Sequence, residues 1–222
     1  MGSAMRSGAP ALVWAMAGAF VAVEAALSAS DAGLLPSGLR VAAYRQFAFF
    51  DLYFDAMLAG HAVPAQLWWS FVTHAFLHGG LLHLAMNTAV FLALGAHLVR
   101  AVGEAAMLAL FFGTAVAGAL FFGLLADTGT SFVPMVGASG ALFGFLGAMK
   151  RWEWRYLAAH DLPKRRFWST VLALTAVNVA LSLGFGGGGG GVAWQAHLGG
   201  FLAGWLAAPL MTPRRGMAIG PI

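Results

Sequence analysis

Four polar side chains with the chemistry of acyl transfer lie within apolar stretches of this 222-residue sequence. They are Ser139, His197, His83 and Asn87. A serine hydroxyl becomes a good nucleophile when a neighbouring base takes its proton, and histidine is the usual base. The side chains of His83 and Asn87 carry N–H groups that can stabilise the negative oxygen of a tetrahedral intermediate. These residue types predict a hydrolytic site if the fold brings them together.

The composition indicates the kind of fold that must position them. The chain is 60% hydrophobic and only 9% charged, whereas soluble domains have about 25% charged residues. A helix that crosses a bilayer needs about 20 apolar residues, and unpaired backbone groups are not tolerated in lipid. We therefore predict an all-α integral membrane protein, one domain over residues 1–222 that forms a six-helix bundle. The predicted spans are residues 11–29, 71–95, 105–126, 139–151, 167–185 and 194–211, the fourth being short.

The distribution of basic residues predicts the orientation, because short cytoplasmic loops retain Lys and Arg. With the N-terminus inside, ten of the twelve basic residues are cytoplasmic and only Arg40 and Arg45 lie outside. The ten are Arg6, Arg100, Lys150, Arg151, Arg155, Lys164, Arg165, Arg166, Arg214 and Arg215. We expect both termini in the cytoplasm and a multi-pass protein of a bacterial inner (plasma) membrane, with the first span retained. The pI near 10.1 then reflects this orientation and not nucleic-acid binding.

The four polar residues come from three predicted spans and lie at similar depths. A helix rises 1.5 Å per residue, which places His197 and His83 about 25 Å, and Asn87 about 20 Å, above the cytoplasmic face. Ser139 lies about 16 to 24 Å above it, depending on where the fourth helix leaves the membrane. Small residues four apart let helices approach closely. Such pairs follow both Ser139 and His197, as Gly140/Gly144 and Gly200/Gly204.

A Ser139/His197 dyad is expected rather than a triad. His197 is the only histidine in the last three spans, and none of the eight acidic residues lies in the fourth or sixth span. We expect Ser139 at the N-terminus of its helix, where its backbone N–H and the helix dipole favour a developing negative charge. The connection over residues 127–138 should then dip into the membrane, buried in protein or lining a wet cavity.

Three motifs resemble those of the rhomboid family of intramembrane serine proteases. The stretch Gly137-Ala-Ser-Gly140 is similar to that family's Gly-x-Ser-Gly motif. The other two are His74-Ala-Phe-Leu-His78-Gly-Gly-Leu-Leu-His83-Leu-Ala-Met-Asn87 and Ala196-His197-Leu-Gly-Gly200-Phe-Leu-Ala-Gly204. Where the family often has a tyrosine four residues after the serine, this chain has Phe143, which keeps the ring that packs on the catalytic histidine.

The resemblance implies a serine endopeptidase with Ser139 as nucleophile, His197 as general base, and His83 and Asn87 in the oxyanion hole. It implies that the substrates are transmembrane helices of other membrane proteins, cut near their outer ends. It implies no metal and no cofactor. Two other functions stay open: a catalytically inactive rhomboid-like protein that binds transmembrane helices, and a small membrane transporter that uses the histidines.

The remaining polar residues have simpler expected roles. His74 and His78 are four apart, but the missing carboxylate and the absence of a His-Glu-x-x-His motif argue against a zinc site with His83. Asn178 is expected to hold helices together, and Glu24 to pair within the bundle or lie near its outer interface. Residues 30–70 should form an amphipathic element at the membrane surface. The run Gly186–Gly191 should be a mobile connection, and whether it gates access is left open.

Overall fold

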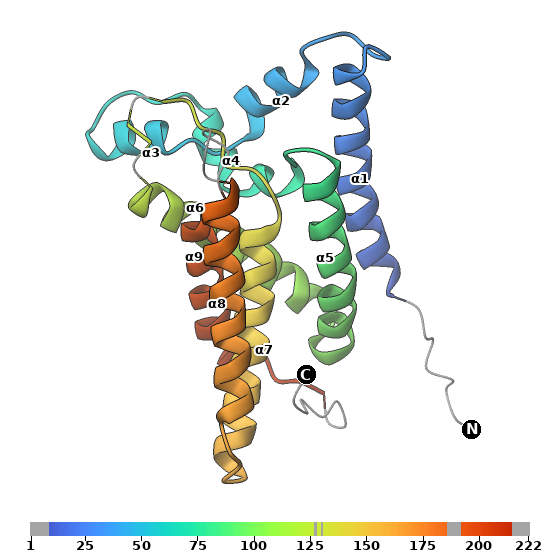
Figure 1. The fold of residues 1–222 in the computed structure, drawn as a ribbon, viewed down its shortest axis with the longest axis vertical. Helices are drawn as coiled ribbons and strands as arrows, with labels where there is room; N and C mark the ends of the chain where they lie inside the picture. Colours follow the sequence, from blue (N-terminus) through green and yellow to red (C-terminus); the bar gives the residue numbers. More distant parts are fainter. Residues whose placement is uncertain (1–8, 127, 130, 186–191, 215–222) are drawn as a thin grey trace.

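The computed structural model describes residues 9–126, 128–129, 131–185 and 192–214. The described part of the chain is helical apart from loops and one isolated β-bridge between Phe49 and Met135 (Figure 1). The α-helices are α1 Ala11–Asp31, α2 Leu39–Phe47, α3 Asp51–Leu58, α4 Gln66–Thr73, α5 Leu81–Val102, α6 Glu104–Leu125, α7 Ser139–Ala159, α8 Arg165–Phe185 and α9 Trp194–Ala207. Two 3₁₀ turns, η1 His74–Phe76 and η2 Ala208–Leu210, complete the set.

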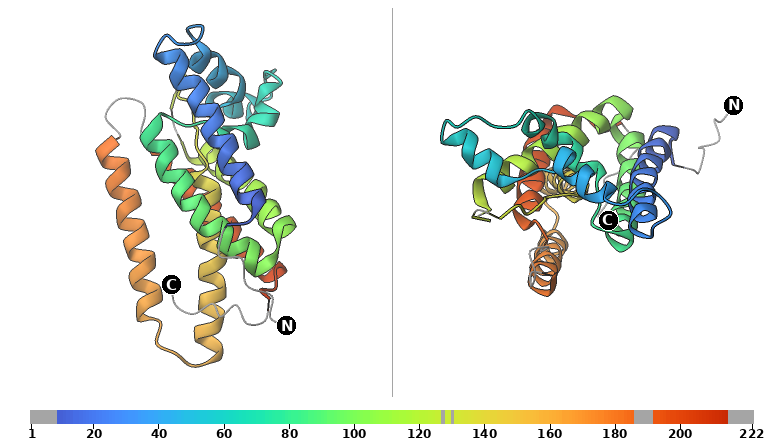
Figure 2. Two further views of the ribbon diagram at one scale, coloured as in Figure 1. Left: turned by 90° about the vertical axis from the view of Figure 1, so that its right-hand side faces the viewer. Right: turned by 90° about the horizontal axis from the view of Figure 1, so that it is seen from above.

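Three of these helices are long and apolar enough to cross a membrane, namely α1, α5 and α6. Helices α7 and α8 have 21 residues each, and α9 has 14. The long helices run side by side, whereas α2, α3 and α4 lie across one end of them (Figures 1 and 2). The short helices of residues 39–73 thus occupy the segment predicted to be an amphipathic surface element.

The second and fourth predicted spans do not match the helices. The run over residues 71–95 is not one helix, because the chain leaves the helix after Phe76 and α5 begins at Leu81. Gly80 lies between them with φ +121°, a backbone conformation that side-chain-bearing residues rarely adopt, so the apolar run is broken there. The helix that begins at Ser139 continues to Ala159 and is not short. Its charged second half lowers the hydropathy without disfavouring the helix, and Lys150 pairs with Glu153 at 2.6 Å.

The last predicted span is also shorter as a helix. Helix α9 ends at Ala207, and η2 carries the chain to Leu210. Pro209 lies within η2, where its missing N–H and its ring prevent continuation of an α-helix. The run Gly186–Gly191, predicted to be a mobile connection, lies outside the described residues.

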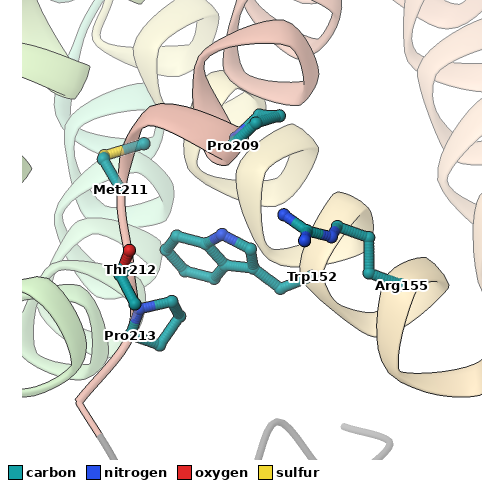
Figure 3. Close-up of a pocket in the computed structure, with 6 residues that line it drawn as sticks. All are labelled: Trp152, Arg155, Pro209, Met211, Thr212 and Pro213. Carbon is teal, nitrogen blue, oxygen red and sulfur yellow. The ribbon is translucent and has the colours of Figure 1, made fainter. Parts of the chain in front are cut away.

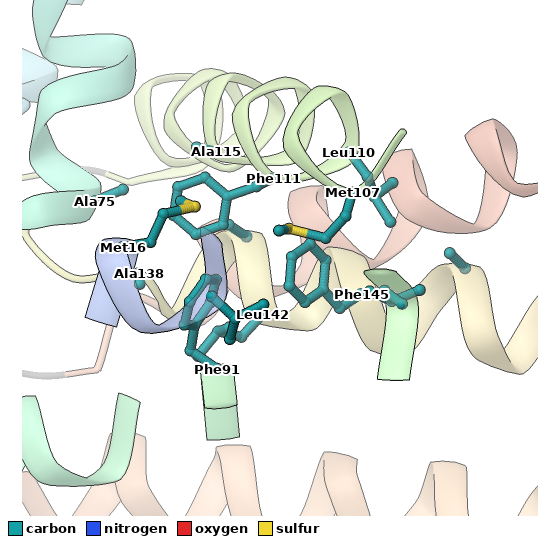
Figure 4. Close-up of a cluster of buried hydrophobic side chains, with 14 of the residues drawn as sticks. Met16, Ala75, Phe91, Met107, Leu110, Phe111, Ala115, Ala138, Leu142 and Phe145 are labelled. Carbon is teal, nitrogen blue, oxygen red and sulfur yellow. The ribbon is translucent and has the colours of Figure 1, made fainter. Parts of the chain in front are cut away.

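The core lies among α1, α5, α6 and α7 and is rich in phenylalanine (Figure 4). Phe20 of α1 packs edge-on against Phe91 of α5 with ring centroids 5.2 Å apart, and Phe91 packs in the same way against Phe111 of α6 at 5.7 Å. Phe145 of α7 closes the cluster at 6.1 Å from Phe111. Edge-to-face aromatic pairs of this kind add about 1 kcal/mol each beyond the area that they bury. This cluster therefore fixes α7 against the other helices.

Helices α7 and α9 approach each other through the glycine pairs that the sequence singles out. A Cβ atom on Gly200 would overlap the carbonyl group of Gly140, and one on Gly204 would overlap the carbonyl group of Gly144. Only hydrogen at these positions permits so short a distance between the two backbones. The predicted close packing of the fourth and sixth spans is confirmed, and it holds the first turn of α7 beside the first turns of α9.

An ion-pair cluster fixes α2 to the end of the bundle. Arg40 of α2 pairs with the fully buried Glu24 of α1 at 2.7 Å and with Asp31 at 2.6 Å. Hydrogen bonding to Glu24 is the largest cause that raises the pKa of Arg40. Arg40 and Tyr44 also donate to the backbone carbonyl of His78, at 3.0 and 2.7 Å. The cluster therefore holds the loop before α5. Glu24, expected to pair within the bundle or to lie near its outer interface, pairs with an arginine of α2 at the end of the bundle.

Candidate active site

Ser139 is the first residue of α7, as the sequence predicts. Its side chain is half-buried. The first N–H groups of a helix have no partner within the helix, and the helix dipole adds partial positive charge there. Ser139 therefore lies where a negative charge that forms during a reaction is stabilised.

The loop before Ser139 is held by backbone hydrogen bonds. Met135 and Phe49 exchange both N–H···O bonds, and the N–H of Gly137 donates to the carbonyl of His74 at 2.9 Å. Gly137 has φ +119°, and a Cβ atom there would lie only 2.8 Å from Nε2 and Cε1 of His83. Glycine is therefore required at this position both for the backbone conformation and for the close approach of the His83 ring.

His197 of α9 contacts Ser139 directly. The His197 Nε2 lies 2.8 Å from the Ser139 Oγ, and His197 is only 5% exposed. Phe143, one turn after Ser139 in α7, stacks on the ring with centroids 4.3 Å apart and an interplanar angle of 7°. The distance between Nε2 and Oγ is that of a hydrogen bond, so the ring is in position to accept the hydroxyl proton.

The other ring nitrogen of His197 contacts a residue that sequence reasoning assigned only to helix packing. Nδ1 lies 2.6 Å from Oδ1 of Asn178 in α8. A depth count along α8 gives the signal that was missed, since Asn178 lies about 20 Å above Arg165, the same height as that of Asn87 above Arg100. The site therefore takes side chains from α7, α8 and α9.

His83 and Asn87 lie on α5 beside the loop that leads to Ser139. The backbone N–H of Gly79 donates to Nδ1 of His83 at 3.1 Å, so the ring proton is carried by Nε2. This Nε2 faces Gly137, and the point at which a Gly137 Cβ would lie is 2.8 Å from Nε2 and 3.8 Å from the Ser139 Oγ. Asn87 is buried and donates one amide hydrogen to the carbonyl of His83 at 2.9 Å. Its second amide hydrogen is available for another acceptor.

His74 and His78 lie behind the site. Both are buried, and their ring nitrogens have no hydrogen-bond partner among the described residues. The His78 ring packs edge-on against that of His83, with centroids 5.3 Å apart. Within the described ranges, no group of three His, Asp or Glu side chains has the geometry of a metal site. The His78 ring therefore packs against the side chain of His83, and His74 holds the loop through its backbone carbonyl, which accepts a hydrogen bond from Gly137.

Of two cavities in the structure, one is lined by residues of this site and the other is not. One of about 540 Å³ lies between α8 and α9 and is lined by His197, Asn178, Phe143 and mostly apolar side chains. The other, of about 250 Å³, lies where α7 meets the segment after α9 (Figure 3). It is lined by Trp152, Arg155, Pro209, Met211, Thr212 and Pro213. None of the four predicted site residues lines this second cavity.

Comparison with known proteins identifies the class. The sequence model of the Rhomboid domain matches residues 65–214. The chain is 30% identical over 157 residues to the Rhomboid protease GluP of Bacillus subtilis, which covers 69% of this chain and 28% of that protein. It is 32% identical over 137 residues to RHOMBOID-like protein 5 of Arabidopsis thaliana, covering 62% of this chain and 42% of the relative. Rhomboid-like protease 3 of Toxoplasma gondii is 33% identical over 136 residues, or 61% of this chain and 49% of the relative.

The apolar helices and the domain match together define an integral membrane protein. This chain belongs to the rhomboid family, and the resemblance drawn from its three motifs is confirmed. It spans less than half of the length of each of these three relatives. The Rhomboid domain match contains all four predicted site residues.

Proposed function

We propose that this protein is an intramembrane serine endopeptidase that hydrolyses peptide bonds in or near transmembrane helices of other membrane proteins. The observation that carries the proposal is the 2.8 Å contact between the Ser139 Oγ and the His197 Nε2. Family membership supports the same reaction. An inactive rhomboid-like protein would not need this pair to be in contact.

The proposed reaction uses Ser139 as nucleophile and His197 as general base. His197 takes the hydroxyl proton at Nε2 while Oγ attacks the scissile carbonyl, and it then delivers that proton to the leaving amine. Water then hydrolyses the acyl-enzyme. His197 takes a proton from the attacking water and returns it to the Ser139 Oγ as the ester bond breaks. The chemistry needs no metal ion or cofactor, because the serine supplies the nucleophile and the histidine carries the proton.

His83 and Asn87 are the proposed donors to the oxyanion. The His83 Nε2 and the Ser139 Oγ lie 2.8 and 3.8 Å from one common point beside Gly137, so the Nε2–H is close to where an oxygen bound to the reacting carbon would lie. The second amide hydrogen of Asn87 and the backbone N–H of Ser139 are further donors. The Gly79–His83 and Asn87–His83 hydrogen bonds fix the side chains of His83 and Asn87 before reaction.

The proposed setting is a six-span protein with both termini in the cytoplasm of a bacterium. The ten-to-two distribution of basic residues supports this topology. The longest of the three matches described above, to a Bacillus subtilis protein, supports a bacterial inner membrane. The substrates are proposed to be transmembrane helices with helix-breaking residues, because a peptide bond in an intact helix has its carbonyl and N–H groups bonded to the neighbouring turns.

The test is cleavage of a panel of single-span membrane proteins in proteoliposomes. We expect wild-type protein to cut at least one of them, and Ser139→Ala and His197→Ala to cut none while remaining folded. Labelling by a serine-directed fluorophosphonate gives a substrate-independent measurement, with loss of labelling expected in both variants. Cleavage or labelling that persists in either variant contradicts the dyad, and a wild type that neither cleaves a substrate nor is labelled contradicts the proposed protease.

Asn87→Ala tests the oxyanion role. We expect kcat to fall roughly tenfold to a thousandfold, because removal of one donor from an oxyanion hole has an effect of that size. Thr88→Ala, at the next residue of α5, is the matched control, and its kcat should stay near that of wild type. Full activity of Asn87→Ala would remove this residue from the mechanism.

A further inference from the structure

We propose that Asn178 is a positioning residue that holds His197 in the orientation and tautomer that the reaction requires. This inference rests on the proposed function. It starts from the 2.6 Å contact between the Asn178 Oδ1 and the His197 Nδ1, which connects α8 to the dyad. The site is then a Ser–His–Asn arrangement, in which Asn178 acts through His197 and does not touch the reacting atoms.

Three contacts fix the His197 ring from different directions. Phe143 covers one face at a centroid distance of 4.3 Å, Ser139 lies at Nε2, and Asn178 lies at Nδ1. Stacking on Phe143 is equally possible for two ring orientations related by a half turn about the Cβ–Cγ bond. The flipped ring would place a carbon where Nδ1 now faces Asn178, so the hydrogen bond to Asn178 supplies a restraint that Phe143 does not.

The chemistry of the two His197 ring nitrogens decides which atom donates in the contact with Asn178. A neutral imidazole carries one N–H and one lone pair, and the nitrogen that accepts a proton from Ser139 must be the one with the lone pair. Nε2 faces Ser139, so the ring proton must be on Nδ1. Asn178 presents its carbonyl oxygen there, which can only accept. If the amide were turned so that its NH₂ group faced Nδ1, the proton would be forced onto Nε2 and the dyad would not work.

The residues around His197 explain why an amide takes this place. No carboxylate pairs with His197 among the described residues. Asn178 lines the cavity between α8 and α9, most of whose other side chains are apolar, such as Leu174 and Val179. An ionised carboxylate is costly in apolar surroundings, whereas a neutral amide orients the ring at a smaller desolvation cost.

The test compares three variants of the full-length protein in proteoliposomes. Asn178→Ala removes the acceptor, Asn178→Asp keeps an acceptor of the same shape, and Thr175→Val is the matched control. Thr175 lies one turn away on α8, lines the same cavity, and its hydroxyl donates only to the Val171 carbonyl of its own helix. The readouts are kcat and KM for a transmembrane substrate, and the rate of labelling by a fluorophosphonate.

We expect Asn178→Ala to lower kcat at least about tenfold with little change in KM, since a wrong tautomer costs up to about 10⁴-fold in a comparable serine protease site. Asn178→Asp should restore kcat to within about threefold of wild type, because a carboxylate accepts the Nδ1 hydrogen at least as strongly as an amide. Thr175→Val should leave both constants unchanged. A normal kcat in Asn178→Ala, or an Asp variant as impaired as the Ala variant, would overturn the proposal.

A measurement on the wild-type protein reads the tautomer directly, and a variant serves only to assign the signal. Nitrogen-15 NMR of histidine-labelled protein, assigned with His197→Gln, reports which nitrogen of His197 carries the proton. We expect it on Nδ1, and a proton on Nε2 would overturn the proposal. This readout also separates the two hypotheses. A wild type that cleaves nothing but shows the Nδ1 proton contradicts the proposed protease and leaves the Asn178 contact standing.

Discussion

Replacing Gly200 with alanine is expected to separate α7 from α9 and to break the contact between Ser139 and His197. The added Cβ atom would overlap the carbonyl oxygen of Gly140 and lie 2.8 Å from its carbonyl carbon. Non-bonded carbon atoms approach each other to about 3.5 Å, so this carbon contact alone requires the helices to move apart by about 0.7 Å, and the overlap with the oxygen requires more. Because Gly140 follows Ser139 and Gly200 lies three residues after His197, this movement acts directly on the dyad.

The size of the effect follows from that displacement. A shift of at least about 0.7 Å would lengthen the 2.8 Å contact between Oγ and Nε2 to about 3.5 Å or more, beyond hydrogen-bond range. Misplacement on this scale lowers rates by about 100-fold. Overpacking a well-packed contact also lowers the free energy of unfolding by about 1 to 3 kcal/mol. We therefore expect kcat/KM to fall about 100-fold and the thermal midpoint in detergent to fall with it.

The assay measures cleavage and thermal unfolding of Gly200→Ala beside Gly113→Ala. Gly113 lies in α6, and a Cβ atom there meets nothing within 4 Å. That control should be as active as wild type and at least as stable, since alanine is the better helix former by up to about 1 kcal/mol. A Gly200→Ala protein with wild-type activity and stability would refute the argument that direct backbone contact aligns the dyad.

Two further predictions concern residues that support the site. Arg40→Ala should lower the free energy of unfolding by about 2 to 4 kcal/mol, because it leaves the buried Glu24 carboxylate without its partner. Arg45→Ala, at an exposed position, should change the free energy of unfolding little, and equal denaturation midpoints for the two variants would contradict this prediction. Phe143→Ala should lower kcat about fivefold, which is the equivalent of about 1 kcal/mol of ring stacking on His197. Phe143→Tyr should keep the wild-type kcat, and similar rates for the two variants would contradict a role for the stacked ring.

Much of the site is predictable from the sequence because its parts are local. Glycines four apart within a predicted apolar helix predict close helix packing, and Gly200 and Gly204 do meet the backbone of α7. The serine between small residues predicts a helix start, and α7 begins at Ser139. Four-residue spacing places Phe143 one turn along the same helix, where its ring stacks on His197.

Other features were mispredicted because they depend on more than hydropathy. A stretch of apolar residues gives no sign of a helix break such as that at Gly80. Such a stretch also ends at the first charged residues, although α7 continues through Lys150 to Ala159. The partner of the His197 Nδ1 depends on how α8 lies beside α9, and a depth count gives the height of Asn178 along α8 but not the direction in which its side chain points. A polar residue in the fifth span was compatible with helix packing alone, so Asn178 was assigned the simpler role.

The most direct test of the central claim is to locate the site of covalent modification. Wild-type protein in native membranes is treated with a fluorophosphonate, digested, and sequenced by tandem mass spectrometry. We expect the phosphonyl group on the Ser139 oxygen alone, and no adduct at Ser139 in His197→Ala, because the hydroxyl reacts only when the histidine takes its proton. An adduct on another residue, or equal modification of Ser139 without His197, would contradict the account.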